Sequence, residues 1–248
     1  MRIPALLLAA LLTALNALPL QAAEGTVLIT GANRGIGLAL AREFTEAGFE
    51  VIGTARKPDR ATQLKATGAR VVQLDVTDAA SVAAMAETLE GVPIDIVINN
   101  AGVALDRGRE LADLDMEAVE LTLAVNTLGP IRVMAALYPN VMAGERKVFA
   151  NISSMMGSME MNTWGCCLGY RASKAALNSA SKTLAVDMGK EGLTFVVFHP
   201  GYVQTDMNDG QGNITPAQSA AGLTKVIAGL DTDDNGRFYD WQGKELPW

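Results

Sequence analysis

The sequence predicts a single α/β domain built on a doubly wound parallel sheet with helices on both faces. Short apolar segments alternate with longer segments of helical periodicity from residue 26 onward, and this alternation is typical of a parallel sheet covered by helices. A glycine-rich turn at residues 30–37 joins the first apolar segment to the first helical one. The length of 248 residues suits one domain with a sizeable core, and no linker or repeat divides the chain.

Seven segments are the expected strands. Strands of a parallel sheet are buried on both faces, so most of them are short and continuously apolar. The expected strands are residues 27–29, 50–54, 70–74, 94–98, 147–152, 193–198 and a last short one at 237–241.

The expected helices follow from helical periodicity and from end signals. They run from the glycine turn to about residue 47 and over 79–89, 116–142, 170–190 and 216–229. Gly129 and Pro130 are expected to interrupt the third helix, since proline lacks the amide proton that an interior helical residue donates. Thr215 is expected to cap the last helix, whose first turn begins with proline.

Composition and charge narrow the possible functions. Hydrophobic residues make up 49% of the chain and the formal net charge is −7. No basic patch stands out, so nucleic acid is not an expected partner. An acidic surface still permits an anionic cofactor, which needs only local positive charge.

The first 23 residues are expected to be a secretory signal peptide or an uncleaved N-terminal membrane anchor, ahead of a domain at 24–248. Arg2 gives a positive start, and residues 5–18 are almost wholly apolar. The run is short for a membrane span. We therefore expect an exported protein, periplasmic or secreted, or one that contacts the membrane only through this anchor.

The two cysteines give a different indication of the compartment. Cys166 and Cys167 are adjacent, and neighbours on a chain rarely reach disulfide geometry. Two free thiols are expected, which does not support export and leaves the cytoplasm as the alternative location.

The turn at residues 30–37 reads Thr-Gly-Ala-Asn-Arg-Gly-Ile-Gly. Glycines let the backbone approach a pyrophosphate, and the helix N-terminus supplies amide donors and the positive end of its dipole. The sequence therefore predicts a dinucleotide-binding turn. Its candidate contacts are Gly31, Asn33, Arg34, Gly35, Ile36 and Gly37.

Tyr170 and Lys174 lie four positions apart in a helical segment, which places both side chains on one helix face. A phenol with a pKa near ~10 is a poor acid–base group at neutral pH. A fixed ammonium beside it is expected to lower that pKa. Ser154 follows an apolar strand earlier in the chain, and a hydroxyl donor with an activated phenol suits a carbonyl reductase or alcohol dehydrogenase.

The order of these motifs resembles the short-chain dehydrogenase/reductase family from about residue 25 to the end. The matching features are the T-G-x-x-x-G-x-G turn at 30–37, the sequence Asn-Asn-Ala-Gly at 99–102, Asn126, Ser154, Tyr170 with Lys174, and the segment 200–205. The stretch from Tyr170 to Asn178 and the C-terminal residues 236–248 resemble the C-factor and sniffer-like branch.

The resemblance implies a Rossmann-type fold, NAD(P) binding and oxidoreductase activity on carbonyl or alcohol groups. It implies that Tyr170 is the general acid in reduction and the base in oxidation, and that Ser154 polarises the substrate carbonyl. Lys174 is implied to lower the pKa of Tyr170 and to bond the nicotinamide ribose. Asn126 is implied to hold a water that relays protons to Lys174.

The resemblance also implies further cofactor contacts. Asp75 is similar to the residue that bonds the adenine amino group, and Asn99, Ala101 and Gly102 to the stretch that lines the adenosine ribose. The remaining implied contacts are Val76, Pro200, Gly201, Val203 and Thr205, with Tyr170 and Lys174 themselves.

The end of the second strand indicates which cofactor is preferred. NAD enzymes generally place an acidic residue there to bond the ribose 2′-hydroxyl. This chain has Ala55, Arg56 and Lys57 instead. Because guanidinium groups bind phosphate bidentately, Arg56 and Arg34 are expected to favour NADP(H) over NAD(H). The alternative is that Arg56 and Lys57 form only a solvated loop.

Two segments depart from the family pattern. Ser154 and Tyr170 are sixteen positions apart, against about a dozen in the family, and the loop between them is expected to shape one wall of the substrate pocket. Ser153 is the alternative alignment to Ser154. The segment 206–214 after Thr205 is short, so the pocket is expected to be open or completed by a partner.

No metal site is expected. Residues 231–236 match the opening of a calcium loop, but Gln242 stands where a bidentate glutamate is needed. His199 is the only histidine and has no metal-binding partners in the sequence.

Two functions remain open: an enzyme acting on a small carbonyl or alcohol substrate, or a cofactor-binding signalling protein with little turnover. A homodimer or homotetramer is expected, because the helices at 116–142 and 170–190 resemble those that pair between subunits in the family.

Overall fold

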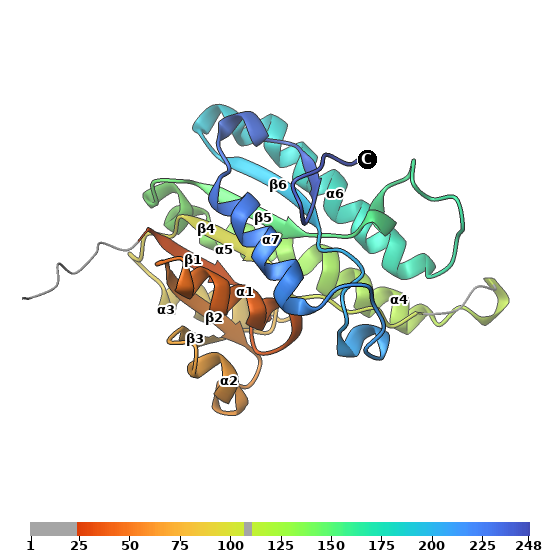
Figure 1. Cartoon of the computed structure of the whole chain (residues 1–248), viewed down its shortest axis with the longest axis horizontal. Helices are drawn as coiled ribbons and strands as arrows, with labels where there is room; N and C mark the ends of the chain where they lie inside the picture. Colours follow the sequence, from red (N-terminus) through yellow and green to blue (C-terminus); the bar gives the residue numbers. More distant parts are fainter. Residues whose placement is uncertain (1–23, 107–110) are drawn as a thin grey trace, which may run out of the picture.

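The structure is a computed structural model that describes residues 24–106 and 111–248 (Figure 1). The segment predicted to be a signal peptide or anchor, residues 1–23, lies outside the described residues.

Within the described ranges, seven parallel strands form one sheet in the order β3-β2-β1-β4-β5-β6-β7. The predicted doubly wound parallel sheet is therefore confirmed. The order changes direction between β1 and β4, and in such sheets ligands bind beyond the carboxyl ends of the strands at this point. The strands are β1 (Thr26–Ile29), β2 (Glu50–Ala55), β3 (Arg70–Gln73), β4 (Ile96–Asn99), β5 (Val148–Ile152), β6 (Thr194–His199) and β7 (Phe238–Asp240).

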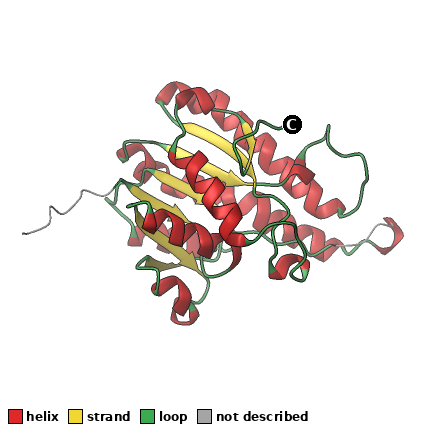
Figure 2. Cartoon of the chain, in the orientation of Figure 1, coloured by secondary structure: helices red, strands yellow, loops and turns green. Residues whose placement is uncertain are grey.

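Helices cover both faces of the sheet (Figures 1 and 2). On one face lie α1 (Gly35–Glu46) and α7 (Pro216–Ala228). On the other lie α3 (Ala79–Thr88), α5 (Gly129–Ala143) and α6 (Leu168–Met188). A hydrophobic cluster lies between each helical layer and the sheet, which accounts for strands that are apolar on both sides.

Two features of the helices differ from expectation. The short α2 (Thr62–Lys65) follows β2 and was not predicted, because four residues are too few to show a helical period. Between α4 (Met116–Leu123) and α5, residues Ala124–Leu128 form a π-helical turn. The predicted interruption is therefore a π turn just before Gly129, and the helix continues because Pro130 lies in the first turn of α5.

The helical run Met116–Ala143 is long and apolar enough to cross a membrane by length and composition alone. Its residues Val133, Leu137 and Val141 are fully buried. They belong to the cluster that packs on the sheet, which identifies this run as a core helix.

Candidate active site

The predicted site residues gather at the carboxyl edge of the sheet. The ends of β1, β2 and β3 lead into the glycine turn, Arg56 and Asp75. The ends of β4, β5 and β6 lead into residues 99–102, Ser154 and residues 200–205. All six strands are parallel, so segments far apart in the sequence meet at one edge.

The glycine turn is fixed by close backbone packing. Gly31 has φ +64°, and a Cβ there would lie 3.0 Å from Ala101 Cα. At Gly37 a Cβ would lie 2.5 Å from Asn100 Nδ2. The Thr30 hydroxyl oxygen accepts the backbone N–H groups of Asn100 and Ala101, at 3.0 Å each. The turn and the segment after β4 are therefore held as one unit.

The N-terminus of α1 suits an anion. Its N-cap, Arg34, makes no side-chain capping bond, and the first turn contains no acidic residue. Gly35 faces Thr205 across the turn, and a Cβ there would meet the Thr205 methyl at 3.8 Å. The residues present fit a dinucleotide pyrophosphate, which such a helix terminus binds through its amides.

Arg56 and Asp75 lie near each other at the ends of β2 and β3. Hydrogen bonds from Thr77 lower the pKa of Asp75, and the positive charge of Arg56 lowers it further against the opposing effect of burial. The Thr77 hydroxyl donates to Asp75 Oδ1 at 2.6 Å. Arg56 itself is exposed, so a cationic side chain is available where the sequence predicts the ribose phosphate.

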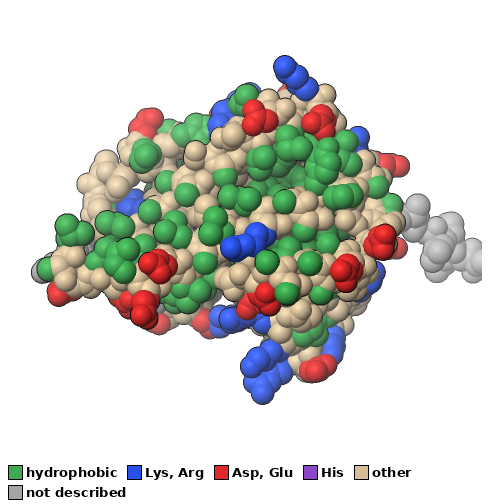
Figure 3. Space-filling view, turned by 180° about the vertical axis from the view of Figure 1, so that it is seen from behind, with side chains coloured by type: hydrophobic (Ala, Val, Ile, Leu, Met, Phe, Trp, Pro, Cys, Tyr) green, Lys and Arg blue, Asp and Glu red, His purple; other side chains and the backbone are tan. Residues whose placement is uncertain are grey.

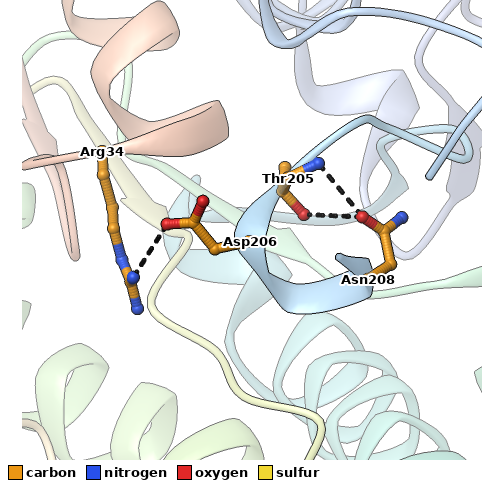
Figure 4. Close-up of polar contacts among 4 residues, drawn as sticks. All are labelled: Arg34, Thr205, Asp206 and Asn208. Atoms are coloured by element: carbon orange, nitrogen blue, oxygen red, sulfur yellow. Dashed lines mark hydrogen bonds and ion pairs between the residues drawn. The ribbon is translucent and has the colours of Figure 1, made fainter. Parts of the chain in front are cut away.

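Arg34 forms an ion pair that the sequence does not indicate. Its guanidinium bonds the Asp206 carboxylate at 3.0 Å (Figure 4). Asp206 follows Thr205, whose amide and hydroxyl both donate to Asn208 Oδ1. The Arg34 and Asp206 side chains are 69% and 78% exposed. An ion pair this exposed contributes little free energy, so Arg34 can exchange Asp206 for a phosphate.

The predicted catalytic residues lie together between β5 and α6. Ser154 Oγ accepts the Met156 N–H at 3.1 Å, and its hydroxyl also hydrogen bonds with Tyr170. Lys174 Nζ donates to Ile152 O at 2.8 Å and lies 5.9 Å from the centre of the Tyr170 ring. Both serines are buried, but the Ser153 hydroxyl lies 2.6 Å from Asn178 Oδ1 whereas Ser154 bonds Tyr170, which supports the choice of Ser154.

Burial changes the titration expected for this pair. Burial raises the pKa of Tyr170, and the hydrogen bond from Ser154 partly opposes that rise. The net direction is therefore upward in this geometry, and the lowering of the Tyr170 pKa by Lys174 stays a prediction. The Lys174 ammonium is directed at the Ile152 carbonyl, and burial lowers its own pKa to about 8.

Asn126 lies in the π turn, fully buried. Its Oδ1 accepts the Val103 N–H at 2.9 Å, and its Nδ2 donates to Val103 O at 2.8 Å and Ser173 Oγ at 3.0 Å. The side chain thus ties the loop after β4 to α6, beside Lys174. Its role in a proton relay stays a prediction.

The side chain of Asn99 points into the sheet. It is 2% exposed and donates to Asn151 Oδ1 at 2.8 Å, while Asn151 donates to Ser181 Oγ at 3.0 Å. A contact between Asn99 and the cofactor ribose is therefore available only to its backbone.

The segment after β6 is held at several points. The Pro200 carbonyl accepts the Ser219 hydroxyl at 2.6 Å, and Gly201 has φ +90°. Val203 is buried and pairs with Ile214 in a short bridge. Val76 is also buried, against Gly129 at the start of α5.

Asp106 is a site residue that the sequence did not predict. Its buried carboxylate accepts the N–H groups of Gly169 at 2.7 Å and Tyr170 at 2.9 Å. An anion at a helix N-terminus is stabilised by the free amides and the helix dipole. Asp106 thereby fixes the first turn of α6, and no motif marks a cap supplied from 63 residues earlier.

Among residues 24–106 and 111–248 no group of three potential metal ligands occurs. Residues Thr232–Asp234 form a short 3-10 turn closed by side chains of Asp231 and Asp234. Burial lowers the pKa of His199 to about 4, against the opposing charge of Asp240.

Comparisons with known proteins agree with this geometry. A family model described as short chain dehydrogenase matches residues 25–214. The chain is 42% identical to C-signal of Myxococcus xanthus over 156 residues, which are 63% of this chain and 93% of that protein. Carbonyl reductase Sniffer of D. melanogaster superposes with a TM-score of 0.85 at 27% identity, covering 90% of this chain and 99% of that one. The NADPH-bound carbonyl reductase from chicken fatty liver has a TM-score of 0.81 at 32% identity, covering 90% and 98%.

Proposed function

Because this chain belongs to the short-chain dehydrogenase family, an oxidoreductase family, we propose that it is an NADP(H)-dependent carbonyl reductase or alcohol dehydrogenase. The convergence of Ser154, Tyr170 and Lys174 at the carboxyl edge of the sheet carries the proposal. A bound nicotinamide would supply or accept the hydride.

The protein's own residues handle the proton and the developing charge. Ser154 Oγ accepts the Met156 amide, and its proton, which bonds Tyr170 in this structure, can turn to a substrate oxygen. Tyr170 lies beside it and donates a proton to the same oxygen during reduction. Two donors directed at one oxygen stabilise the negative charge that hydride attack creates there. Lys174 holds a positive charge behind the phenol at pH values below its pKa of about 8.

The similarity to C-signal favours a second candidate, a cofactor-binding signalling protein without significant turnover. Two separate measurements distinguish the candidates: NADPH binding by calorimetry, and NADPH oxidation with a panel of aldehydes and ketones. The enzyme proposal requires both binding and turnover. Binding without turnover on any carbonyl would favour the signalling candidate.

Cofactor preference provides a sharper prediction. Arg56→Asp should weaken NADPH binding and reverse the preference over NADH by about 1–3 kcal/mol, the scale of a charge-assisted hydrogen bond. Arg56 is exposed beside Asp75, so the change should not disturb the fold. Calorimetric titration with both cofactors measures the effect.

Arg70→Asp is the matched control, because it makes the same charge change at the other end of the sheet, where Arg70 bonds Thr88 O. Equal affinity of the wild type for NADPH and NADH would contradict the assignment of Arg56 to the 2′-phosphate.

We also propose a homodimer or homotetramer assembled through the long helices. Helix α6 exposes the side chains of Val186 and Leu168, and the helical run Met116–Ala143 exposes those of Leu121 and Leu128. Hydrophobic side chains occupy much of the face seen from behind (Figure 3). Small residues such as Ala175 permit close helix approach. Light scattering at micromolar concentration checks this, and a monomer there would contradict it.

Export, or anchoring by residues 1–23, is likewise a proposal, supported by the apolar run behind Arg2. Cell fractionation with N-terminal sequencing of the native protein tests it, and an uncleaved cytoplasmic protein would contradict it.

A further inference from the structure

The loop between the Ser154 turn and the Tyr170 helix has an unusual backbone. Gly165, Cys166 and Cys167 have consecutive φ values of +67°, +68° and +54°. The left-handed region is unfavourable for residues other than glycine. Two successive cysteines in that region therefore require surrounding contacts that hold them there.

Arg171 supplies those contacts. Its Nε donates to the carbonyl oxygens of Gly165 at 3.0 Å and Cys166 at 3.1 Å. The guanidinium carbon lies 4.3 Å from the centre of the Trp164 ring. One planar group therefore fixes the strained end of the loop and covers one face of its tryptophan.

The same guanidinium reaches the other end of the loop. Its Nη1 donates to Met156 O at 3.3 Å, and the amide of Met156 is the group that bonds Ser154 Oγ. Arg171 follows Tyr170 directly in α6. It therefore connects the turn that orients the serine, the loop wall and the helix that carries the tyrosine.

The environment of Arg171 requires arginine in particular. The residue is 8% exposed, and its hydrogen bonds in the described part of the chain all go to backbone carbonyls. A planar fork can bond several carbonyls and stack on an indole at once, whereas an ammonium cannot do both.

We propose that Arg171 is a positioning residue that presets residues 158–167 as a fixed wall of the substrate site, with Trp164 as its apolar face. The Trp164 side chain is half exposed although Arg171 covers one ring face, which leaves indole surface for a ligand. The wall fits a carbonyl compound with an aryl or other bulky apolar substituent. This assignment of substrate class rests on the proposed function.

Hydrogen exchange of the whole protein tests the wall without any need for turnover. Arg171→Met keeps the stem and removes every guanidinium bond, so amides of residues 158–167 should exchange about tenfold faster or more. Arg171→Lys should also exchange faster, because it cannot form the fork. Arg70→Met is the matched control. In that variant, the amides of residues 158–167 should exchange as they do in the wild type. Unchanged protection of 158–167 in Arg171→Met would overturn the proposal.

Steady-state kinetics then test substrate class with acetophenone and propanal as probes. Arg171→Met should raise KM for acetophenone about tenfold more than KM for propanal, the difference expected for one good apolar or stacking contact, and leave the Kd for NADPH near wild type. Trp164→Ala should raise KM for acetophenone by a similar factor. Because Trp164 is half exposed, its removal should not unfold the protein. Equal effects on both carbonyls, or none, would overturn the wall's role in specificity.

The two measurements separate this inference from the function beneath it. A wild type that reduces no carbonyl would refute the proposed function and with it the aryl-ketone assignment. The exchange result would still decide whether Arg171 holds the loop.

Discussion

Tyr170→Phe should lower carbonyl turnover by about 10²–10⁴-fold, the contribution of one general acid, and leave NADPH affinity within about twofold. Only the hydroxyl is removed, and the ring keeps its packing at the start of α6. The backbone N–H of residue 170 still bonds Asp106, so the first helical turn should survive. Initial rates on a substrate that the wild type reduces, with calorimetry for NADPH, measure both quantities.

Tyr138→Phe is the matched control, because it removes a phenol hydroxyl that bonds Glu191 at the surface. It should behave as wild type. Unchanged turnover in Tyr170→Phe would show that the assigned mechanism is wrong even though the fold is right.

Lys174→Met should reduce both turnover and cofactor affinity, because the ammonium supports the phenol and is expected to bond the nicotinamide ribose. We expect a loss in kcat/KM for NADPH of at least about 10²-fold, the lower range for a group in proton transfer. Lys182→Met is a close control on the same helix, since Lys182 also donates its ammonium to a backbone carbonyl, that of Gly236, at 3.0 Å.

The pH profile distinguishes this role from a structural one. Burial lowers the pKa of Lys174 to about 8, so its positive charge is present below that pH and lost above it. Reductive kcat/KM for NADPH, which reports the free enzyme, should therefore fall as the pH rises through about 8. Lys174→Met should lack this decline. A wild-type profile that stays flat from pH 7 to 9 would contradict the assignment.

The sequence predicted those elements whose pattern depends on neighbouring residues in the chain. Strands buried on both faces are continuous apolar runs, and β2, β5 and β6 begin and end within one residue of their predicted limits. The strand predicted at 94–98 begins two residues later. Ile94 is apolar and buried, but the Asp95 carboxylate accepts N–H groups of Thr26 and Glu145, so this stretch is a junction. Apolar character alone cannot tell a residue inside a strand from a buried residue just before it.

Long-range partners were not predictable. The sequence identified Arg34 as a cation of the glycine turn, but nothing near it in the chain indicates Asp206, 172 positions later. It likewise paired Tyr170 with Lys174 by helical spacing but could not show that the ammonium bonds Ile152 O. Burial, which sets both pKa shifts, depends on the packed structure. Asp106 and Arg171 were also not predictable, because their partners are backbone groups, which carry no sequence signal.

The buried bond between Asn99 and Asn151 has a consequence for how the sheet assembles. The two residues are direct partners across β4 and β5, and Asn151 lies between the apolar residues Ala150 and Ile152. If β5 slipped by one position, an amide would face a hydrocarbon side chain without a hydrogen-bond partner, at a cost of about 1–3 kcal/mol for each group. The bond therefore selects one strand alignment among competitors that the apolar residues alone would tolerate. That alignment sets the relative height of the segments carrying Gly102 and Ser154, so an error of one residue during folding would leave the cofactor segment and the serine mismatched by about 3.3 Å.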